Sequence, residues 1–255
     1  MGAISLRFAS LGSGSRGNAL LVRGRDTTVL VDCGFSVSQI EQRLARLDLT
    51  PGDLDAIVIT HEHADHIGGA APLSCKYDLP VWMTAGTLAA CKDKSFHRCE
   101  LFHAHAGFAL SDLRIKPFPV PHDAREPCQF VFDDGEYQLG LLTDTGSITP
   151  HIVDSLRCCD ALLLECNYEP ELLEQGPYPW ALKQRIKSNY GHLSNGQAAE
   201  LLRRAEFPRL RTLIGLHISE QNNRPELALA AMSDALQGSC DDVRVADQDN
   251  GFGWV

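Results

Sequence analysis

The segment "ITHEHADHIGG" (59–69) places three histidines and one aspartate within six positions, directly after an apolar run. His61 and His63 are two residues apart, and Asp65 and His66 follow on the next stretch of chain. Imidazole and carboxylate groups without a thiolate suit Zn²⁺, Mn²⁺ or Fe²⁺, and ligand type alone does not choose among these ions. The spacing therefore predicts a metal-binding loop at the end of a strand.

Residues of the metal-ligand type also follow four other apolar runs. Asp32 ends "VLVD", His61 follows "IVIT", His122 follows "FPVP", Asp144 follows "GLLT" and His217 follows "LIGL". Strands that end in such side chains project ligands from one edge of a rigid sheet. A catalytic zinc ion usually takes three protein ligands, so this larger set predicts two ions. Such ions lie about 3.5–4 Å apart and share a carboxylate and a bridging water, which becomes hydroxide near neutral pH.

Short β-branched runs predict strands at residues 4–10, 27–34, 55–60, 79–84, 113–120, 128–134, 137–144, 160–166, 211–217 and 242–247. Helical patterns lie between them along the 255 residues. Ile40, Leu44 and Leu47 have helical spacing, and Ser194 with Gln197 forms a capping-box pattern at the start of another helix. The pattern predicts a mixed α/β fold rather than strict βαβ repetition. Because no Gly/Pro/Ser-rich linker divides the chain, we expect one domain over residues 1–255.

Composition limits the class of protein. The net charge of −10 argues against a protein that coats nucleic acid with its whole surface, although local basic patches remain compatible with it. No apolar run approaches the roughly 18 residues of a membrane span. The N-terminal residues 1–14 lack the features of a signal peptide, and the nine cysteines contain no CxxC pair. We therefore expect a cytoplasmic protein with reduced thiols and no obligatory protein partner; the sequence leaves the oligomeric state open.

Four further histidines have no carboxylate in a ligand-like pattern nearby. They are His97, His103, His105 and His151. We interpret them as surface or core residues.

With these residues in hand, the chain resembles the metallo-β-lactamase superfamily of binuclear metallohydrolases, and more narrowly the YycJ/WalJ branch of exonucleases related to ribonuclease Z. The supporting stretches are "SLGSGSRGNALLV" (10–22), "PHDA" (121–124), "LTDTG" (142–146), the segment 162–195 and "LHISEQNN" (216–223). The resemblance implies a four-layer αββα sandwich. Tyr168 departs from the branch, which often carries His there. The chain also lacks the β-CASP insertion and the tRNA-gripping arm of ribonuclease Z.

The resemblance also implies a role for each site residue. His61, His63 and His122 would hold one ion and Asp65, His66 and His217 the other, with Asp144 bridging and Asp32 orienting the ligands by hydrogen bonds. His192 would stabilise the charge on the scissile phosphate or protonate the leaving oxygen, and Asp65 and Asp144 would also serve catalysis. Ser13, Ser15 and Asn18, on a Gly-rich turn, would bind phosphate.

The segment 179–192 indicates which class of substrate the site accepts. It carries Lys183, Arg185 and Lys187 with no acidic residue, beside Trp180 and Tyr190. Cations that follow the backbone and rings that stack on bases suit a single strand of nucleic acid. Arg203, Arg204, Arg209 and Arg211 add positive charge nearby in sequence.

We therefore expect a binuclear phosphodiesterase in which a metal-bridging hydroxide attacks single-stranded DNA, or RNA. The 5′-to-3′ direction is implied by the resemblance alone. The alternative is an acyl hydrolase of the glyoxalase II or lactonase type, in which the basic segment would have no evident task. A redox or sensing protein and a metal-stabilised binding protein are two further possibilities. The intact His63 argues against the redox protein, because di-iron relatives carry Glu there.

Overall fold

Two β-sheets stack face to face in the computed structural model, which describes residues 6–205 and 207–255. The first sheet has the order β1-β2-β3-β4-β5-β6 and the second the order β13-β12-β11-β10-β9-β8-β7. The expectations for residues 1–5, including part of the first predicted strand and of the signal-peptide assessment, lie outside the described residues.

The first sheet begins as an antiparallel meander and continues as a parallel sheet from β3 to β6. Its strands are β1 (Arg7–Gly12), β2 (Ala19–Arg23), β3 (Thr28–Val31), β4 (Ala56–Val58), β5 (Pro80–Met83) and β6 (Arg98–Leu101). The second sheet is antiparallel from β7 to β10 and parallel from β10 to β13. Its strands are β7 (Phe108–Leu110), β8 (Leu113–Pro119), β9 (Cys128–Asp133), β10 (Gln138–Leu142), β11 (Ala161–Glu165), β12 (Thr212–Leu216) and β13 (Asp242–Val245).

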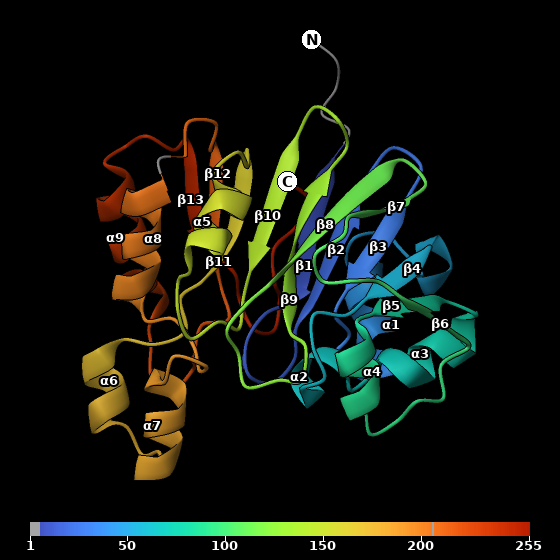
Figure 1. The fold of residues 1–255 in the computed structure, drawn as a ribbon, viewed down its shortest axis with the longest axis horizontal. Coiled ribbons are helices and arrows are strands. Elements are labelled where there is room, and N and C mark those ends of the chain that lie inside the picture. The colour runs from blue at the N-terminus through green and yellow to red at the C-terminus, as the bar shows by residue number, and fades with distance from the viewer. Residues whose placement is uncertain (1–5, 206) are drawn as a thin grey trace.

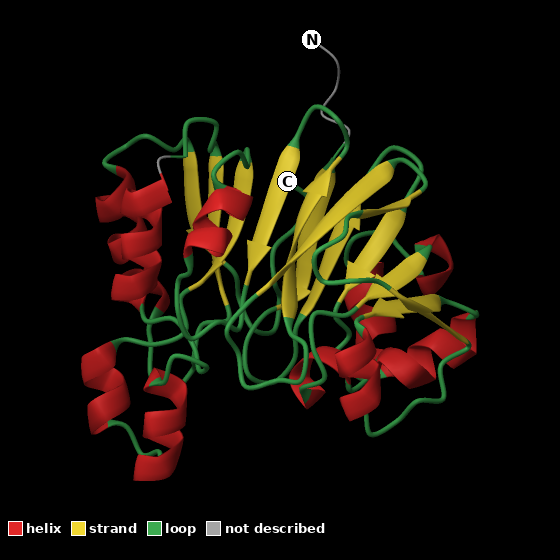
Figure 2. Cartoon of the chain, viewed as in Figure 1, coloured by secondary structure: helices red, strands yellow, loops and turns green. Residues whose placement is uncertain are grey.

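Helices form the two outer layers (Figures 1 and 2). Beside the first sheet lie α1 (Val37–Ala45), α2 (Ala64–Ile67), α3 (Ala70–Tyr77) and α4 (Ala85–Ala90), with a short 3₁₀ turn at Pro51–Asp53. Beside the second lie α5 (Pro150–Leu156), α8 (Asn195–Ala205) and α9 (Pro225–Leu236). Two more helices, α6 (Pro170–Gln175) and α7 (Trp180–Lys187), project from the lower edge of the second sheet in Figure 1.

Three apolar cores separate the four layers. Successive residues of β11 show how one strand serves two of them: Ala161 and Leu163 face the first sheet, whereas Leu162 and Leu164 face the helices. A strand covered on both faces has no solvent side, which is why its sequence is continuously apolar. The third core packs α1 and α3 on the first sheet through residues such as Ile40 and Leu73. The mixed α/β fold and its αββα layers are thus confirmed.

The predicted helix start at Ser194 is also confirmed. Ser194 and Gln197 form the expected capping box: the backbone N–H of Gln197 donates to Ser194 Oγ at 3.2 Å and the backbone N–H of Ser194 to Gln197 Oε1 at 2.9 Å. Ile40 and Leu44 are the buried residues of α1, whereas Leu47 lies beyond its end. Within the described residues, no helix is long and apolar enough to cross a membrane.

Candidate metal centre

The predicted ligands lie at one edge of the two stacked sheets. β3 and β4 are parallel, and β8 runs in the same direction as β10, β11 and β12, so their carboxyl ends meet at this edge. Open α/β sheets bind ligands at this position. The chain therefore brings together residues that are as much as 185 positions apart in sequence, from Asp32 to His217.

One set of possible ligands consists of His61, His63 and His122, whose ligand atoms all lie within 4.8 Å of one another. His63 Nδ1 is 3.2 Å from His122 Nε2. His61 and His122 are buried, and His63 lines the open side of the site.

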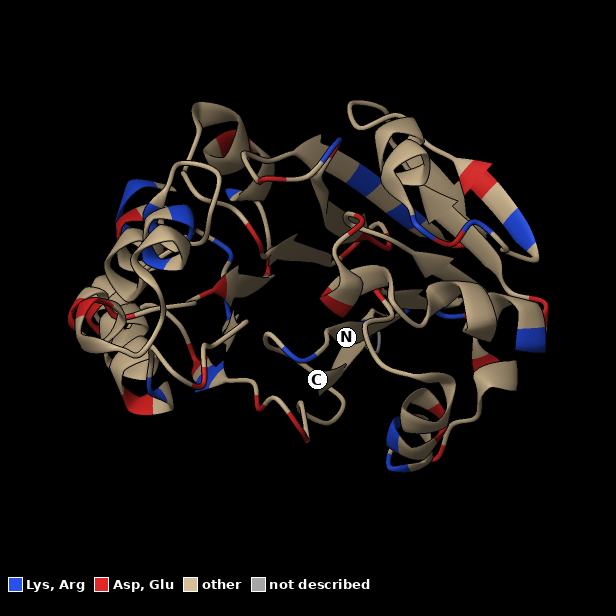
Figure 3. Cartoon of the chain, turned by 90° about the horizontal axis from the view of Figure 1, so that it is seen from below, with Lys and Arg blue, Asp and Glu red and all other residues tan. Residues whose placement is uncertain are grey.

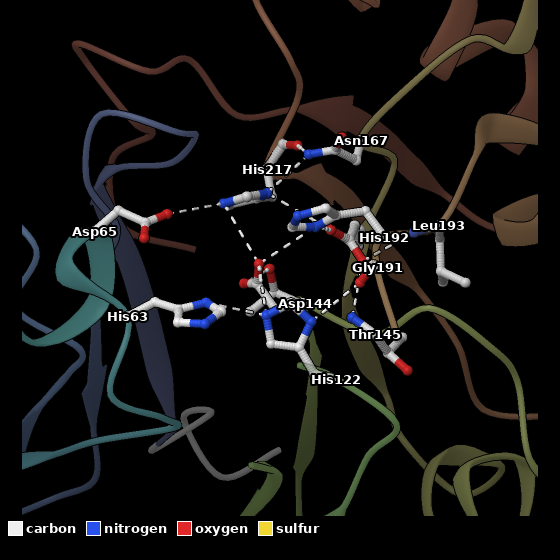
Figure 4. A network of polar contacts seen from close by, with 12 residues as sticks. His63, Asp65, His122, Asp144, Thr145, Asn167, Gly191, His192, Leu193 and His217 are labelled. Carbon is white, nitrogen blue, oxygen red and sulfur yellow. Dashed lines mark hydrogen bonds and ion pairs between the residues drawn. The ribbon is translucent and has the colours of Figure 1, made fainter. Parts of the chain in front are cut away.

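A second set consists of Asp65, His66 and His217, again within 4.8 Å. Asp65 Oδ2 is 3.5 Å from His66 Nε2 and 3.5 Å from His217 Nε2. Asp144 lies between the two sets: its Oδ2 is 3.0 Å from His66 Nε2 and its Oδ1 is 4.0 Å from His122 Nε2. Figure 4 shows Asp65, His63, His122 and His217 arranged around the Asp144 carboxylate.

Hydrogen bonds at the outer ring nitrogens leave the inner nitrogens as acceptors. The Thr60 hydroxyl has one hydrogen, which it donates to Asp32 at 2.9 Å. His61 Nδ1, 2.9 Å from the same hydroxyl oxygen, must then be the donor, so Nε2 carries the lone pair. His66 Nδ1 lies 2.7 Å from Asp32 Oδ2, and His122 Nδ1 lies 3.0 Å from the carbonyl oxygen of Gly191. Such outer partners orient histidines toward a metal.

Two inner nitrogens form no hydrogen bond among the described residues. They are Nε2 of His61 and Nε2 of His217, and both are buried, although the second of them faces the Asp65 carboxylate at 3.5 Å. An unpaired buried polar atom costs about 1–3 kcal/mol. Burial, followed by the charge of His66, lowers the pKa of His61 well below its usual value, which keeps that ring neutral. The donor set and these unpaired nitrogens fit divalent metal ions.

The electrostatics of the carboxylates point the same way. Burial alone would raise the pKa of Asp144, yet His217 and His66 hold it well below its usual value. Burial lowers the pKa of His217, but Asp144 and Asp65 outweigh it and raise that pKa to about 10. Cations are therefore strongly favoured at this cluster, and a metal ion competes there with protons on the histidines.

Three of the strand-end residues have left-handed backbone conformations. The φ angles of Asp32, Asp144 and His217 are 60°, 48° and 53°. Each such non-glycine residue costs about 1–3 kcal/mol and persists where the surrounding structure enforces it. Strain of this kind is concentrated at functional sites. Here it turns each side chain from the end of its strand into the shared centre.

The model of the Beta-lactamase superfamily domain matches residues 27–218 of this chain. This segment contains both sets of possible ligands and Asp144, seven His and Asp residues in all. This chain belongs to that superfamily. Within it, the chain is 35% identical over 242 residues to exodeoxyribonuclease WalJ of Streptococcus pneumoniae serotype 2, covering 92% of this chain and 90% of the relative. It is 34% identical over the same span to exodeoxyribonuclease YycJ of Bacillus anthracis. These matches place the chain in the WalJ/YycJ branch.

A solved structure of similar shape is that of YhfI, a metallo-beta-lactamase fold protein from Bacillus subtilis. It matches with a TM-score of 0.76 over 98% of each chain at 18% identity. Identity this low bears on the fold alone, and it supports the αββα arrangement of the superfamily.

His192 lies beside the His and Asp cluster of this superfamily member, and a buried glutamate holds it. His192 Nδ1 is 2.7 Å from Glu165 Oε1 and 3.4 Å from Asp144 Oδ1. Glu165 is fully buried, and its other oxygen accepts the backbone N–H groups of Thr145 and Leu193 at 3.1 and 3.2 Å. The ring of His192 stacks on His217 with 5.3 Å between centroids.

A cleft of about 220 Å³ opens onto the cluster. Residues of the metal-ligand type that line it include His63, Asp65, Asp144 and His217. His192 and Arg185 line the same cleft, and α7 forms part of its wall through Leu182 and Ile186. A substrate bound in the cleft therefore contacts both the cluster and His192.

The three residues of the Gly-rich turn have different surroundings. Ser13 and Asn18 are buried: Ser13 Oγ accepts the backbone N–H of His217 at 2.9 Å, and the backbone N–H of Asn18 donates to the carbonyl oxygen of Asp65 at 2.8 Å. Asn18 Nδ2 also lies 3.1 Å from His66 Nε2. Ser15 is exposed and lines the cleft. Two of the three thus hold ligand loops, and one faces a bound molecule.

The three basic residues of α7 also diverge. Arg185 lines the cleft and pairs with Asp123. Lys183 instead donates to the backbone oxygen of Glu174, and Lys187 pairs with the Glu174 carboxylate at 2.9 Å. Trp180 and Tyr190 are 75% and 60% exposed, so both rings are free to stack on a ligand.

Other sequence candidates lie outside the centre. Arg209 and Arg211 precede β12 and line a cavity at the opposite end of the sheet, where Arg209 pairs with Asp160 at 2.9 Å. His97 is exposed and pairs with Asp78, and the other three exposed histidines belong to none of the possible ligand sets in the described residues.

Sequence reasoning missed three residues of the site: Glu165, Asn167 and Asp123. Asn167 Nδ2 lies 3.0 Å from His217 Nδ1 and donates to its backbone oxygen at 2.9 Å. Asp123 accepts from Arg185, and its backbone oxygen lies 3.2 Å from His63 Nε2. Glu165 follows "ALLL" as Asp144 follows "GLLT", so the strand-end signal was present in the sequence.

Proposed function

We propose that this chain is a metal-dependent exonuclease that hydrolyses phosphodiester bonds of single-stranded DNA from the 5′ end. The observation that carries the proposal is the His192–Glu165 pair. Its histidine lines the same cleft as His63, Asp65, Asp144 and His217 of the candidate metal cluster. The names of the WalJ and YycJ relatives, both exodeoxyribonucleases, support it.

Two divalent ions, Zn²⁺ or Mn²⁺ with Fe²⁺ as a further candidate, would complete the site. His61, His63 and His122 would hold one, and Asp65, His66 and His217 the other, with Asp144 reaching both. When bound, such a pair supplies Lewis acidity and lowers the pKa of bound water toward 7. Asp32 fixes the rings of His61, through Thr60, and of His66.

His192 is placed to hold and deliver a proton. Its Nδ1 faces Glu165, so Nε2 is the ring atom available to a substrate in the cleft. We propose that Nε2 protonates the leaving oxygen of the cleaved ester. Glu165 is a positioning residue: it fixes the ring orientation and stabilises the protonated imidazole, as a buried carboxylate does for a general acid–base histidine.

An acyl hydrolase is the second candidate, because a binuclear site also accepts carbonyl substrates. A basic side chain in the cleft favours the phosphodiester, since Arg185 complements an anion. The exposed rings of Trp180 and Tyr190 support a single strand, whose bases are free to stack.

We further propose that residues 1–255 form one domain and that the protein is cytoplasmic. The first core joins the two sheets, and each of the other two packs helices on one of these sheets, which supports the first statement. All nine cysteines are free thiols, as expected in a reducing compartment.

The deciding experiment incubates the metal-loaded protein with 5′-labelled and 3′-labelled single-stranded DNA and RNA, and with a thioester as control. Mn²⁺ and Zn²⁺ are tested separately. We expect DNA to be shortened from its 5′ end. The 5′ label should therefore appear in mononucleotides at once, whereas the 3′ label should remain on progressively shorter strands. Turnover of the thioester with untouched nucleic acid would contradict the nuclease function and favour the acyl hydrolase.

A further inference from the structure

Apart from histidines, the described charged residues that line the cleft are three aspartates and one arginine. Asp65, Asp123 and Asp144 line it, and Arg185 is the one Lys or Arg among its lining residues in the described chain. Figure 3 views the edge where α6 and α7 lie and shows basic and acidic positions interspersed rather than a broad basic face. Arg185 is therefore the guanidinium available in the cleft to an anion that lies beyond the metal cluster.

Arg185 uses only part of its hydrogen-bonding capacity within the protein. Its Nε donates to Asp123 Oδ2, and no bond from either terminal nitrogen to another described residue is present. The guanidinium side chain is 54% exposed at the cleft wall. A free guanidinium edge presents two parallel N–H groups, which match two oxygens of a phosphate.

Asp123 separates this free edge from the metal cluster. Its Oδ2 faces Arg185, while its Oδ1 lies 3.5 Å from His122 Nε2 and 3.9 Å from His63 Nε2. A phosphate seated at the histidines is therefore a whole carboxylate away from the free edge of Arg185. A second anion can therefore occupy that edge while the first is at the histidines.

The helix that carries Arg185 is anchored, so the position of the guanidinium is defined. Ile186 packs into a small core with Tyr168 and Leu173, and both lysines of α7 are tied to Glu174 of α6. Those lysines bind the two helices together and leave Arg185 as the cation that faces the cleft.

Resting on the proposed nuclease function, we propose that Arg185 binds a second, non-scissile phosphate of the strand through its two terminal nitrogens. The site then binds two phosphates of a strand: one at the metal cluster and the neighbouring phosphate at Arg185. A phosphodiester with a single phosphate, or an uncharged acyl ester, lacks the second contact.

The test measures binding by calorimetry, so it does not depend on turnover. Metal-loaded protein is titrated with thymidine 3′,5′-bisphosphate and with thymidine 5′-monophosphate, and the ratio of the two dissociation constants is compared among variants. We expect wild type to prefer the bisphosphate by at least about tenfold, the size of one charge-assisted contact. Arg185→Ala should abolish the preference, and Arg185→Lys, which keeps the charge but loses the paired N–H groups, should retain part of it.

Arg203→Ala is the matched control, because it removes the same charge from an exposed position on α8 away from the cleft. The inference is overturned if wild type shows no preference for the bisphosphate or if Arg185→Ala keeps the wild-type preference. It is also overturned if Arg203→Ala loses as much of the preference as Arg185→Ala. A preference that depends on Arg185 in a protein that leaves DNA intact would uphold the two-phosphate site and refute the nuclease function. Metal content and melting temperature, measured for each variant, identify a loss of fold.

Discussion

Glu165 Oε1 lies 2.7 Å from His192 Nδ1, and Glu165 is the fully buried end of a central strand. Burial alone would raise the pKa of this carboxyl, but His192 and His217 together outweigh burial and lower it, so the glutamate is ionised beside the imidazole. In the proposed mechanism, this pair supplies an oriented proton carrier next to the metal cluster. Its geometry distinguishes this site from a plain metal-binding loop.

Glu165→Gln should lower kcat about 10–100-fold, because the amide keeps the volume but loses the charge that orients and stabilises protonated His192. Rates on labelled single-stranded DNA and metal content are the measurements. A purely structural role is distinguished by a double-mutant cycle: in a His192→Ala background, Glu165→Gln should cost little more. Additive losses in the cycle would contradict the assignment of Glu165 as the partner of His192.

His192→Ala and Asp144→Ala should fail in different ways. His192→Ala should lower kcat about 100- to 10,000-fold, the range for a general acid, with metal content near that of wild type. Asp144→Ala should lower the metal content itself, since Asp144 lies within 4.0 Å of ligand nitrogens from both sets. Elemental analysis beside rate measurements separates them, with exposed His151→Ala as the control. Equal metal loss in both variants would mean that His192 is a ligand.

The strand-end pattern allowed most of the site to be predicted. Asp144 and His217 were found because a single polar residue follows a buried strand, and strands that run in one direction present such residues at one edge. Glu165 shows the same pattern, but its role depends on contact with His192, which lies 27 positions later. A one-dimensional pattern contains no information on that contact.

The charge pattern of α7 was less informative for the same reason. Lys183, Arg185 and Lys187 look equivalent in sequence, yet Glu174 on the neighbouring helix pairs with the two lysines and leaves the arginine at the cleft. The strands β2, β6 and β7 also escaped prediction. Two of them, β6 and β7, are short edge strands, whose formation depends on pairing with a neighbour more than on an apolar run.

Asp133 should make stability depend on pH at the end of the sheet opposite the metal cluster. Burial alone would raise its pKa, but hydrogen bonds from Lys116, Gly135 and Arg114 lower it below the usual value. Because the folded pKa is the lower one, the contribution is complete above the unfolded pKa of about 3.9 and is lost as pH falls through the folded pKa.

Asp133→Asn should therefore reduce the free energy of unfolding by about 1–3 kcal/mol near neutral pH, and the difference from wild type should shrink as the pH falls below about 3.9. Urea unfolding of both proteins measures this difference. No metal is added, because protonation of the ligand histidines would release it as the pH falls and would change the stability of both proteins. A difference that stays constant over this range would show that the charge of Asp133 is not responsible.

The two serines of the Gly-rich turn provide a matched pair of variants. Ser13 Oγ accepts the buried backbone N–H of His217, whereas Ser15 is exposed at the cleft. Ser13→Ala should leave that N–H unpaired, which costs about 1–3 kcal/mol of stability, and should weaken metal binding about tenfold by loosening His217. Ser15→Ala should leave stability and metal affinity unchanged and should raise KM for DNA.

Chelator competition, thermal melting and steady-state kinetics measure these effects. If Ser13→Ala raises KM while metal affinity stays constant, Ser13 contacts the substrate and not the ligand loop.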